Sequence, residues 1–182
     1  MRVVFLDRDG VINEYPGDAK YVNNKDEFTF IPGSIEGIKK LNVAGFKIFV
    51  ISNQAGIAKG LYSLEDLEQI NEKMLSGLRS QGAYIEGIYY CTHHPQAGCS
   101  CRKPKTGLLE KAISDLGAVP DESFFIGDSF KDMKAALGFK AKPILVLSGR
   151  EKMNNRPNWE FEPDCVLESL FEAADYICSQ YV

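Results

Sequence analysis

The sequence predicts an α/β protein with a mainly parallel central sheet between two layers of helices. Apolar runs typical of strands alternate along the chain with segments whose apolar residues recur at helical spacing. The runs at 3–6 and 46–52 are almost continuously apolar, as expected for strands that are covered on both faces. Hydrophobic residues make up 45% and charged residues 25% of the 182 positions, as in a globular protein with a full core. We therefore expect a three-layer fold in a single domain, residues 1–182.

The first half of the chain is expected to hold three strands and two helices. Pro32-Gly33 precedes the first helix, and Ser63 followed by Glu65-Asp66 is typical of the start of the second. In order, the expected elements are a strand at 3–6, a polar loop at 13–27, a helix at 34–45, a strand at 46–52, a helix from 63 to about 81 and a strand at 85–91.

The second half continues the alternation with shorter elements. The expected elements are a helix at 107–116, a strand at 123–126, a helix at 131–137, strands at 143–147 and 164–166, and a closing helix at 167–179. No inserted segment is long enough for a separate cap domain, so we expect a capless fold with an open site. The loops at 13–27 and 91–101 are the candidates for covering that site.

Bulk properties exclude several classes of protein. The net charge of -4 gives no general footprint for nucleic acid, although a few local cations can still dominate a pocket. No apolar stretch approaches the ~20 residues that a transmembrane helix needs. The N-terminus leads directly into a strand without the pattern of a secretory signal, so we expect a cytoplasmic protein. No exposed apolar stripe stands out, and we expect a monomer without nucleic-acid or membrane partners.

Two carboxylates follow the first expected strand at once. Asp7 and Asp9 are separated by one residue, and Gly10 comes next. Ligands of open α/β sheets bind just beyond the carboxyl ends of the strands, where these acids are expected to lie. Such a pair can bind Mg²⁺, and one of its members can act as a nucleophile. A polar turn is the alternative reading of this motif taken alone.

The loop at 91–101 holds three of the five cysteines and both histidines. Four Cys and His ligands bind Zn²⁺ tetrahedrally and leave no position for water, which is typical of a structural site. His94 is the alternative to His93, and the Cys-x-His spacing favours His93. Cys165 and Cys178 are expected to be core or half-buried thiols. The predicted zinc ligands are Cys91, His93, Cys99 and Cys101.

The chain resembles the haloacid-dehalogenase-like (HAD) phosphatases in four motifs that occur in the right order. These are Asp7-Arg-Asp9-Gly10, the strand ending in Ser52-Asn53-Gln54, Arg102-Lys103-Pro104, and the strand ending in Gly127-Asp128-Ser129. The resemblance covers nearly the whole chain. It implies a Rossmann-like HAD fold and hydrolysis of a small phosphate ester.

The resemblance also implies the roles of individual residues. Asp7 is expected to form an aspartyl-phosphate, and Asp9 to act as general acid and then as general base. The predicted catalytic residues are Asp7, Asp9, Ser52, Arg102 and Lys103. The predicted Mg²⁺ ligands are Asp7, Asp128, and Asp9 and Ser129 through their backbone carbonyls. The predicted substrate-binding residues are Asp7, Arg8, Asp9, Tyr21, Ser52, Asn53, Gln54, Ala55, Arg102 and Lys103.

Two residues near these motifs, Arg8 and Asp132, stay outside the predicted catalytic set. An extended backbone would point the Arg8 side chain away from the neighbouring acids, so Arg8 is left out of the catalytic set. Asp132 lies one helical turn after Asp128, where it can orient Lys103 or a metal-bound water. A solvated helix face is the alternative for Asp132.

The zinc loop and the strings around it narrow the resemblance to two groups. The 52–60 segment, Ser-Asn-Gln-Ala-Gly-Ile-Ala-Lys-Gly, and the 89–95 segment resemble the D-glycero-D-manno-heptose 1,7-bisphosphate 7-phosphatases. Histidinol-phosphate phosphatases share the zinc loop but continue differently after Asn53-Gln54. Another small sugar or polyol phosphate, a phosphotransferase and a non-catalytic binding module are further alternatives. The preferred anomer at carbon 1 is not predicted.

Overall fold

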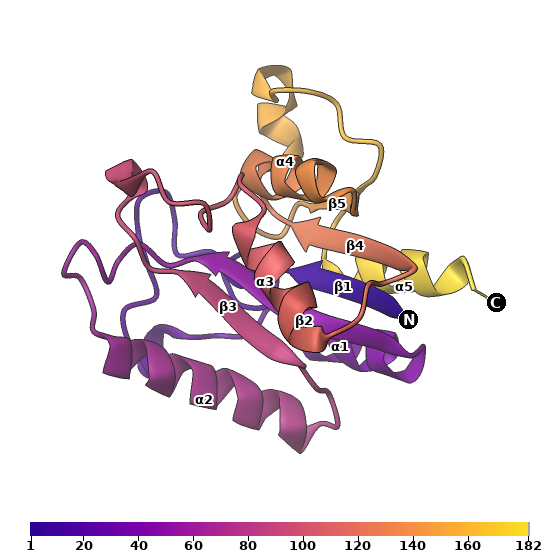
Figure 1. Ribbon diagram of the computed structural model, residues 1–182, viewed down its shortest axis with the longest axis horizontal. Coiled ribbons are helices and arrows are strands. Elements are labelled where there is room, and N and C mark those ends of the chain that lie inside the picture. Colours follow the sequence, from indigo (N-terminus) through magenta and orange to yellow (C-terminus); the bar gives the residue numbers. More distant parts are fainter. Residues whose placement is uncertain (182) are drawn as a thin grey trace.

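The computed structural model describes residues 1–181 and contains a six-stranded parallel sheet with helices on both faces (Figure 1). The spatial order is β3-β2-β1-β4-β5-β6, and every pair of neighbours is parallel. The predicted α/β class is therefore confirmed. The strands are β1 (Arg2–Leu6), β2 (Phe46–Asn53), β3 (Gly87–Cys91), β4 (Glu122–Gly127), β5 (Lys142–Val146) and β6 (Val166–Leu167).

Five α-helices connect or follow the strands. The predicted start of α2 is confirmed by a capping box, in which the Ser63 side chain accepts from the Asp66 N–H and Asp66 accepts from the Ser63 N–H. The sequence did not predict three short 3-10 helices, η1 (Lys25–Glu27), η2 (Pro95–Ala97) and η3 (Met153–Asn158). The α-helices are α1 (Ser34–Val43), α2 (Leu64–Ser80), α3 (Gly107–Leu116), α4 (Phe130–Phe139) and α5 (Leu170–Ser179).

The sheet is the middle of three layers (Figure 1). Successive side chains of β1 point to opposite faces, as the period of a strand requires. Val4 and Leu6 pack into the core beneath α1, α2 and α5, whereas Val3 and Phe5 pack into the core beneath α3 and α4. All four side chains are completely buried. The continuous apolar runs seen in the sequence follow from this double coverage.

The order of the strands identifies where a ligand is expected to bind, at the carboxyl ends of β1 and β4. After β1 the chain builds β2 and β3 on one side, and it returns to the other side of β1 to form β4. The β1/β4 pair is thus the switch point at which open α/β sheets bind ligands. In their register Leu6 lies opposite Ile126, so the residues after both strands emerge at the same edge.

The connections within the described part of the chain contain no cap domain, as predicted. Between β1 and β2 lie a loop, η1 and α1, and between β2 and β3 lies α2. No helix among residues 1–181 is long and apolar enough to cross a membrane.

Candidate active site

Asp7 and Asp128 lie together where β1 and β4 end. Asp7 Oδ1 accepts a hydrogen bond from the Arg8 N–H at 2.7 Å, and Asp128 Oδ2 accepts from the Arg150 N–H at 2.7 Å. Together with Asp132 they form a group in which each residue offers one carboxylate oxygen, and these three oxygens lie within 4.8 Å of one another. The structure therefore brings two predicted magnesium ligands together and adds a third carboxylate.

Burial and mutual repulsion raise the pKa of Asp7 and of Asp128. Burial raises the pKa of Asp7 to about 6, although the nearby Lys103 cation opposes the increase. Burial, and then the charges of Asp7 and Asp132, raise the pKa of Asp128 well above its usual range. Clustered buried carboxylates with too little positive charge fit a hard divalent cation with oxygen ligands. The residues present thus fit the Mg²⁺ that the sequence predicts.

Two glycines leave room for the Asp128 carboxylate. A Cβ added at Gly149 would lie 2.1 Å from Asp128 Oδ2, and one added at Gly10 would lie 2.2 Å from the same atom. Gly10 also has φ +84°, a backbone conformation that disfavours other residues. Both glycines are therefore required by the close approach of backbone to carboxylate.

Lys103 is a buried cation beside Asp7. Its Nζ lies 2.9 Å from Asp7 Oδ2 and 2.6 Å from Asp132 Oδ1, and it donates to the Ile51 carbonyl at 2.8 Å. Burial by itself would lower the pKa of Lys103, but the charges of Asp132 and Asp7 outweigh it and raise the pKa. The side chain is 2% exposed, so the ammonium group is held as a fixed point charge beside Asp7.

The end of β2 is joined to the segment that carries Lys103. Asn53 accepts from the Lys103 N–H and donates to the Lys103 carbonyl, both at 3.1 Å. In the sheet Asn53 lies opposite Cys91, the last residue of β3. Ser52, Asn53 and Lys103 therefore line one wall of the same cavity.

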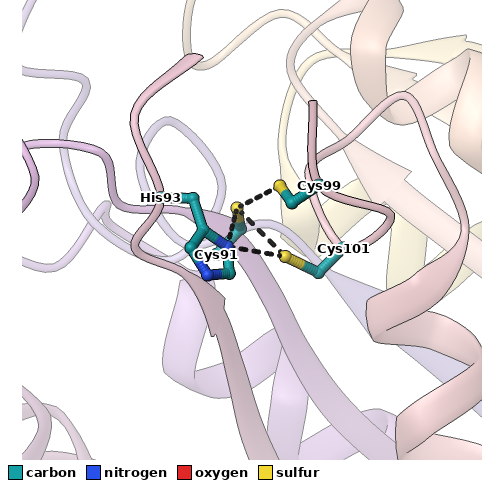
Figure 2. A group of neighbouring side chains, drawn as sticks. All are labelled: Cys91, His93, Cys99 and Cys101. Atoms are coloured by element: carbon teal, nitrogen blue, oxygen red, sulfur yellow. Dashed lines mark hydrogen bonds between the residues drawn. The ribbon is translucent and has the colours of Figure 1, made fainter. Parts of the chain in front are cut away.

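The four predicted zinc ligands converge in one group (Figure 2). His93 Nδ1 lies 3.1 Å from Cys101 Sγ, and Cys91 Sγ lies 3.3 Å from Cys101 Sγ and 3.6 Å from Cys99 Sγ. None of the cysteines is in a disulfide. Three thiols and one imidazole that face a common centre fit tetrahedral Zn²⁺.

The loop at 91–101 is joined to the cavity by the chain itself. Cys101 is followed immediately by Arg102 and Lys103, which both line the cavity. Lys105 Nζ donates to the carbonyls of Gly98 and Cys99 and so braces the loop. His94 accepts from the Gln96 N–H as the cap of η2, and His93 is the histidine that lies with the three cysteines.

The cavity has a volume of about 360 Å³, and cations outnumber carboxylates in its lining. Four carboxylates line it, Asp7, Asp9, Asp128 and Asp132, and six cations line it, Lys20, Lys59, Arg102, Lys103, Lys131 and Arg150. Burial, and then the charges of Arg150 and Arg102, lower the pKa of Lys131. This excess of positive charge suits a ligand with more than one anionic group, although the chain as a whole carries a charge of -4.

The predicted polar loop between β1 and α1 forms part of the rim. Tyr15, Lys20 and Tyr21 all line the cavity. Tyr21 is packed against Tyr62, with ring centroids 6.1 Å apart, and Lys59 Nζ lies 5.2 Å from the centre of the Tyr21 ring. The loop thus brings the predicted Tyr21 to the place where a substrate would be contacted.

The expectation that Arg8 points away from the acids is wrong. Its guanidinium is completely buried and pairs with Asp9 at 2.9 Å. The chain leaves the extended conformation at this residue, because the Arg8 carbonyl accepts from the N–H groups of Ile12 and Asn13. The alternation of side chains along a strand does not extend into such a turn.

Four of the predicted site residues do not present a free group to the cavity in the way that was expected. The side chains of Arg8, Gln54 and Ala55 are completely buried and are not among those that line the cavity. The Ser129 carbonyl accepts from the N–H groups of Asp132 and Met133 at the start of α4, so both of its lone pairs are engaged. The Ser129 hydroxyl donates to Asp132 Oδ2 at 2.6 Å.

Sequence reasoning missed four cations of the cavity, Lys20, Lys59, Lys131 and Arg150. Arg150 follows the end of β5, so its position beyond a parallel strand was a usable signal. Lys131 is the second residue of α4, where a lysine more often faces solvent. Nothing in the local pattern distinguishes Lys59 from a surface lysine.

Comparisons with known proteins agree with this geometry. Residues 100–173 match a family model described as HAD-hydrolase-like. The D-glycero-beta-D-manno-heptose-1,7-bisphosphate 7-phosphatase of Pasteurella multocida is 41% identical over 156 residues, 82% of this chain and 83% of the relative. The enzyme of the same name from Haemophilus ducreyi is 38% identical and aligns with 97% of this chain and 98% of its own length.

A solved structure extends the agreement to three dimensions. The D,D-heptose 1,7-bisphosphate phosphatase of B. bronchiseptica, complexed with magnesium and phosphate, matches with a TM-score of 0.90 at 30% identity. The match covers 99% of both chains. The agreement extends over the whole fold, including the edge at which the cavity lies.

Proposed function

The chain belongs to the HAD-like family of D-glycero-beta-D-manno-heptose-1,7-bisphosphate 7-phosphatases, and from this membership we propose that it removes the 7-phosphate of the β anomer. The products are heptose 1-phosphate and inorganic phosphate. The observation that carries the proposal is the arrangement of Asp7, Lys103 and Asp128 at the carboxyl edge of the sheet. The same proposal treats residues 1–182 as one catalytic unit that works as a monomer in the cytoplasm.

The proposed reaction has two steps at Asp7. A carboxylate oxygen of Asp7 attacks phosphorus, the bond between phosphorus and the 7-oxygen breaks, and that oxygen takes a proton from Asp9. Water then attacks the phosphorus of the aspartyl-phosphate and gives its proton to Asp9. The phosphorus–oxygen bond to Asp7 breaks, phosphate leaves, and both aspartates return to their starting forms.

The surrounding residues hold the phosphoryl group and its charge. Lys103, fixed between Asp7 and Asp132, is placed to stabilise the transferred group. Ser52 and Asn53 line the wall beside it and are proposed to donate to its oxygens. Mg²⁺, held by Asp7, Asp128 and the Asp9 carbonyl, would neutralise negative charge on both the nucleophile and the phosphate.

The cluster of Cys91, His93, Cys99 and Cys101 is proposed to hold one structural Zn²⁺. The loop between Cys91 and Cys101 has few apolar side chains to order it, so metal ligation would supply the order. Because Arg102 and Lys103 follow the last ligand, the bound metal would fix their backbone beside the phosphate. Its role is thus mechanical.

The choice of a bisphosphate rests on the distribution of cations. Lys103 serves the phosphate at Asp7, but five further cations line the cavity. After burial, the charges of Arg150 and Arg102 are close enough to Lys131 to lower its pKa. A second phosphate on the same sugar would pair with this excess charge.

The test is phosphate release with Mg²⁺ on both anomers of heptose 1,7-bisphosphate and on histidinol phosphate. We expect kcat/KM on the β anomer to exceed that on the other two by at least ~10²-fold, about 2.7 kcal/mol of differential transition-state binding. Asp7→Asn is expected to abolish turnover and to leave the fold intact. Comparable weak activity on all three compounds would refute the proposed substrate assignment. Turnover by Asp7→Asn would refute the proposed role of Asp7 as nucleophile.

A further inference from the structure

Arg8 is a completely buried cation beside the proposed general acid. Its Nε and Nη2 atoms donate to Asp9 Oδ1 at 3.1 and 2.9 Å, and Nη2 also lies 3.2 Å from Asp9 Oδ2. The Asp9 side chain keeps 17% of its surface exposed and lines the cavity. Arg8 itself is not among the residues that line the cavity, so it meets the substrate only through Asp9.

Three further side chains, Gln54, Tyr62 and Asn13, help to hold the Asp9 carboxylate. Gln54 Oε1 accepts from the Tyr62 hydroxyl at 2.6 Å and from Arg8 Nη2 at 3.3 Å. Because both of these groups donate to the oxygen of the Gln54 amide, its Nε2 faces Asp9 and donates to Asp9 Oδ2 at 2.9 Å. Asn13 Nδ2 donates to Asp9 Oδ1, also at 2.9 Å. Each carboxylate oxygen is therefore held by two side chains.

The buried ion pair of Arg8 and Asp9 is not explained by a gain in folding stability. Burying a guanidinium costs desolvation free energy that one carboxylate rarely repays in full, and apolar replacements of buried ion pairs are often neutral or stabilising. Arg8 Nη1 is buried and has no hydrogen-bond partner among the described residues, which adds to that cost. The geometry instead serves orientation, since a planar fork fixes the plane of the carboxylate that it meets.

We propose that Arg8 is a positioning residue, which holds the Asp9 carboxyl group in the plane from which it meets the oxygen of the leaving group. The inference rests on the proposed function, in which Asp9 protonates that oxygen. Gln54 and Tyr62 act with Arg8, because they fix the opposite carboxylate oxygen through one amide group.

The proposal makes the effect of Arg8 depend on the leaving group. An alkoxide is a strong base and needs a proton from a well-placed acid as the bond to phosphorus breaks. 4-Nitrophenolate is a weak base and leaves without that help. Displacing Asp9 should therefore slow hydrolysis of a sugar phosphate much more than hydrolysis of 4-nitrophenyl phosphate, whereas general damage to the site should slow both equally.

The experiment compares kcat/KM of Arg8→Lys and wild type, with Mg²⁺, on the heptose bisphosphate and on 4-nitrophenyl phosphate. Lysine keeps the charge but lacks the fork. We expect a loss of about 10- to 100-fold on the sugar phosphate, part of the 10²–10⁴-fold that general acids contribute, and less than about 3-fold on the aryl phosphate. Arg79→Lys, at an exposed arginine on α2, is the matched control and should change neither.

Tyr62→Phe is the second variant, and it stays informative if Arg8→Lys does not fold. It removes one hydroxyl that orients Gln54 and should show the same selective loss on a smaller scale. Placed on Asp9→Asn, Arg8→Lys should add no further loss on either substrate. Equal losses on both substrates, or a further loss in the Asp9→Asn background, would overturn the positioning role. Absence of sugar-phosphate hydrolysis by wild type, or turnover by Asp7→Asn, would instead overturn the proposed function.

Discussion

Lys103 Nζ lies 2.6 Å from Asp132 Oδ1, and the two side chains are 2% and 0% exposed. The other oxygen of Asp132 accepts from the N–H and hydroxyl of Ser129 at the start of α4. One carboxylate therefore caps a helix and holds the cation of the active site. The position of Lys103 thus depends on the start of α4.

Replacing Asp132 by asparagine should lower kcat by about 10- to 100-fold with a smaller change in KM, because Lys103 loses the partner that orients it. Asp132 is also the largest charge that raises the pKa of Lys103, so the loss should grow as the pH rises and Lys103 deprotonates. The measurement is kcat between pH 6 and 9. Asp115→Asn, at an exposed surface ion pair, is the control, and a loss that does not vary with pH would contradict the expectation.

Stability without metal should fall as the pH rises from about 4 to above 6. The folded protein holds a proton on Asp7 with a pKa of about 6, whereas the unfolded chain releases it near 3.8, so the folded state binds more protons in this window. The cost is on the order of 3 kcal/mol of unfolding free energy. Mg²⁺ binds the ionised form, so it should raise the Tm more at pH 8 than at pH 5. Equal shifts at both values would contradict this account.

Removing one zinc ligand should impair catalysis from outside the reacting centre. Cys101→Ser is expected to lose the metal and at least about 10-fold in kcat/KM, because Arg102 and Lys103 follow directly. Cys178→Ser, at a half-buried thiol outside the cluster, is the control and should keep both. Elemental analysis should find one zinc per chain in wild type and in the control. Full activity in a zinc-free Cys101→Ser protein would rule out the mechanical role.

Arg150 should matter only when the substrate carries its second phosphate. Arg150→Ala is expected to lower kcat/KM on the bisphosphate by about 10-fold, since a charge-assisted hydrogen bond contributes roughly 1.5–3 kcal/mol. The same variant should change hydrolysis of heptose 7-phosphate by less than about 3-fold. Lys111→Ala, an exposed cation on α3 outside the cavity, serves as the control. Equal losses on both substrates would place Arg150 elsewhere in the mechanism.

Much of the fold follows from local signals in the sequence. The five α-helices and the strands begin and end within three residues of the expected positions, because apolar periodicity and caps such as Ser63 act over short distances. The Cys/His cluster was also predictable as a group, since its four residues lie in one loop and their spacing alone limits the choice.

The remaining parts of the site depend on contacts between distant segments. The direction of the Arg8 side chain could not be predicted from the sequence. The chain turns directly after Arg8, so the alternation of the strand no longer applies, and Arg8 contacts the distant Gln54. Lys59 and Lys131 reach the cavity from a loop and a helix whose directions are set by tertiary packing. Asp132 left two readings open, and only the position of Lys103 distinguishes them.

The hydrogen-bonded register of β1 and β4 has a consequence for how such an enzyme can change. Asp7 and Asp128 leave adjacent strands, so their separation derives from a strand spacing of about 4.8 Å. The separation of Asp7 and Asp128 therefore does not depend on the side chains at the rim of the cavity. The loops at 13–27 and 91–101 can therefore vary in length and charge, and with them the accepted ester, while the dimensions of the reacting centre stay constant.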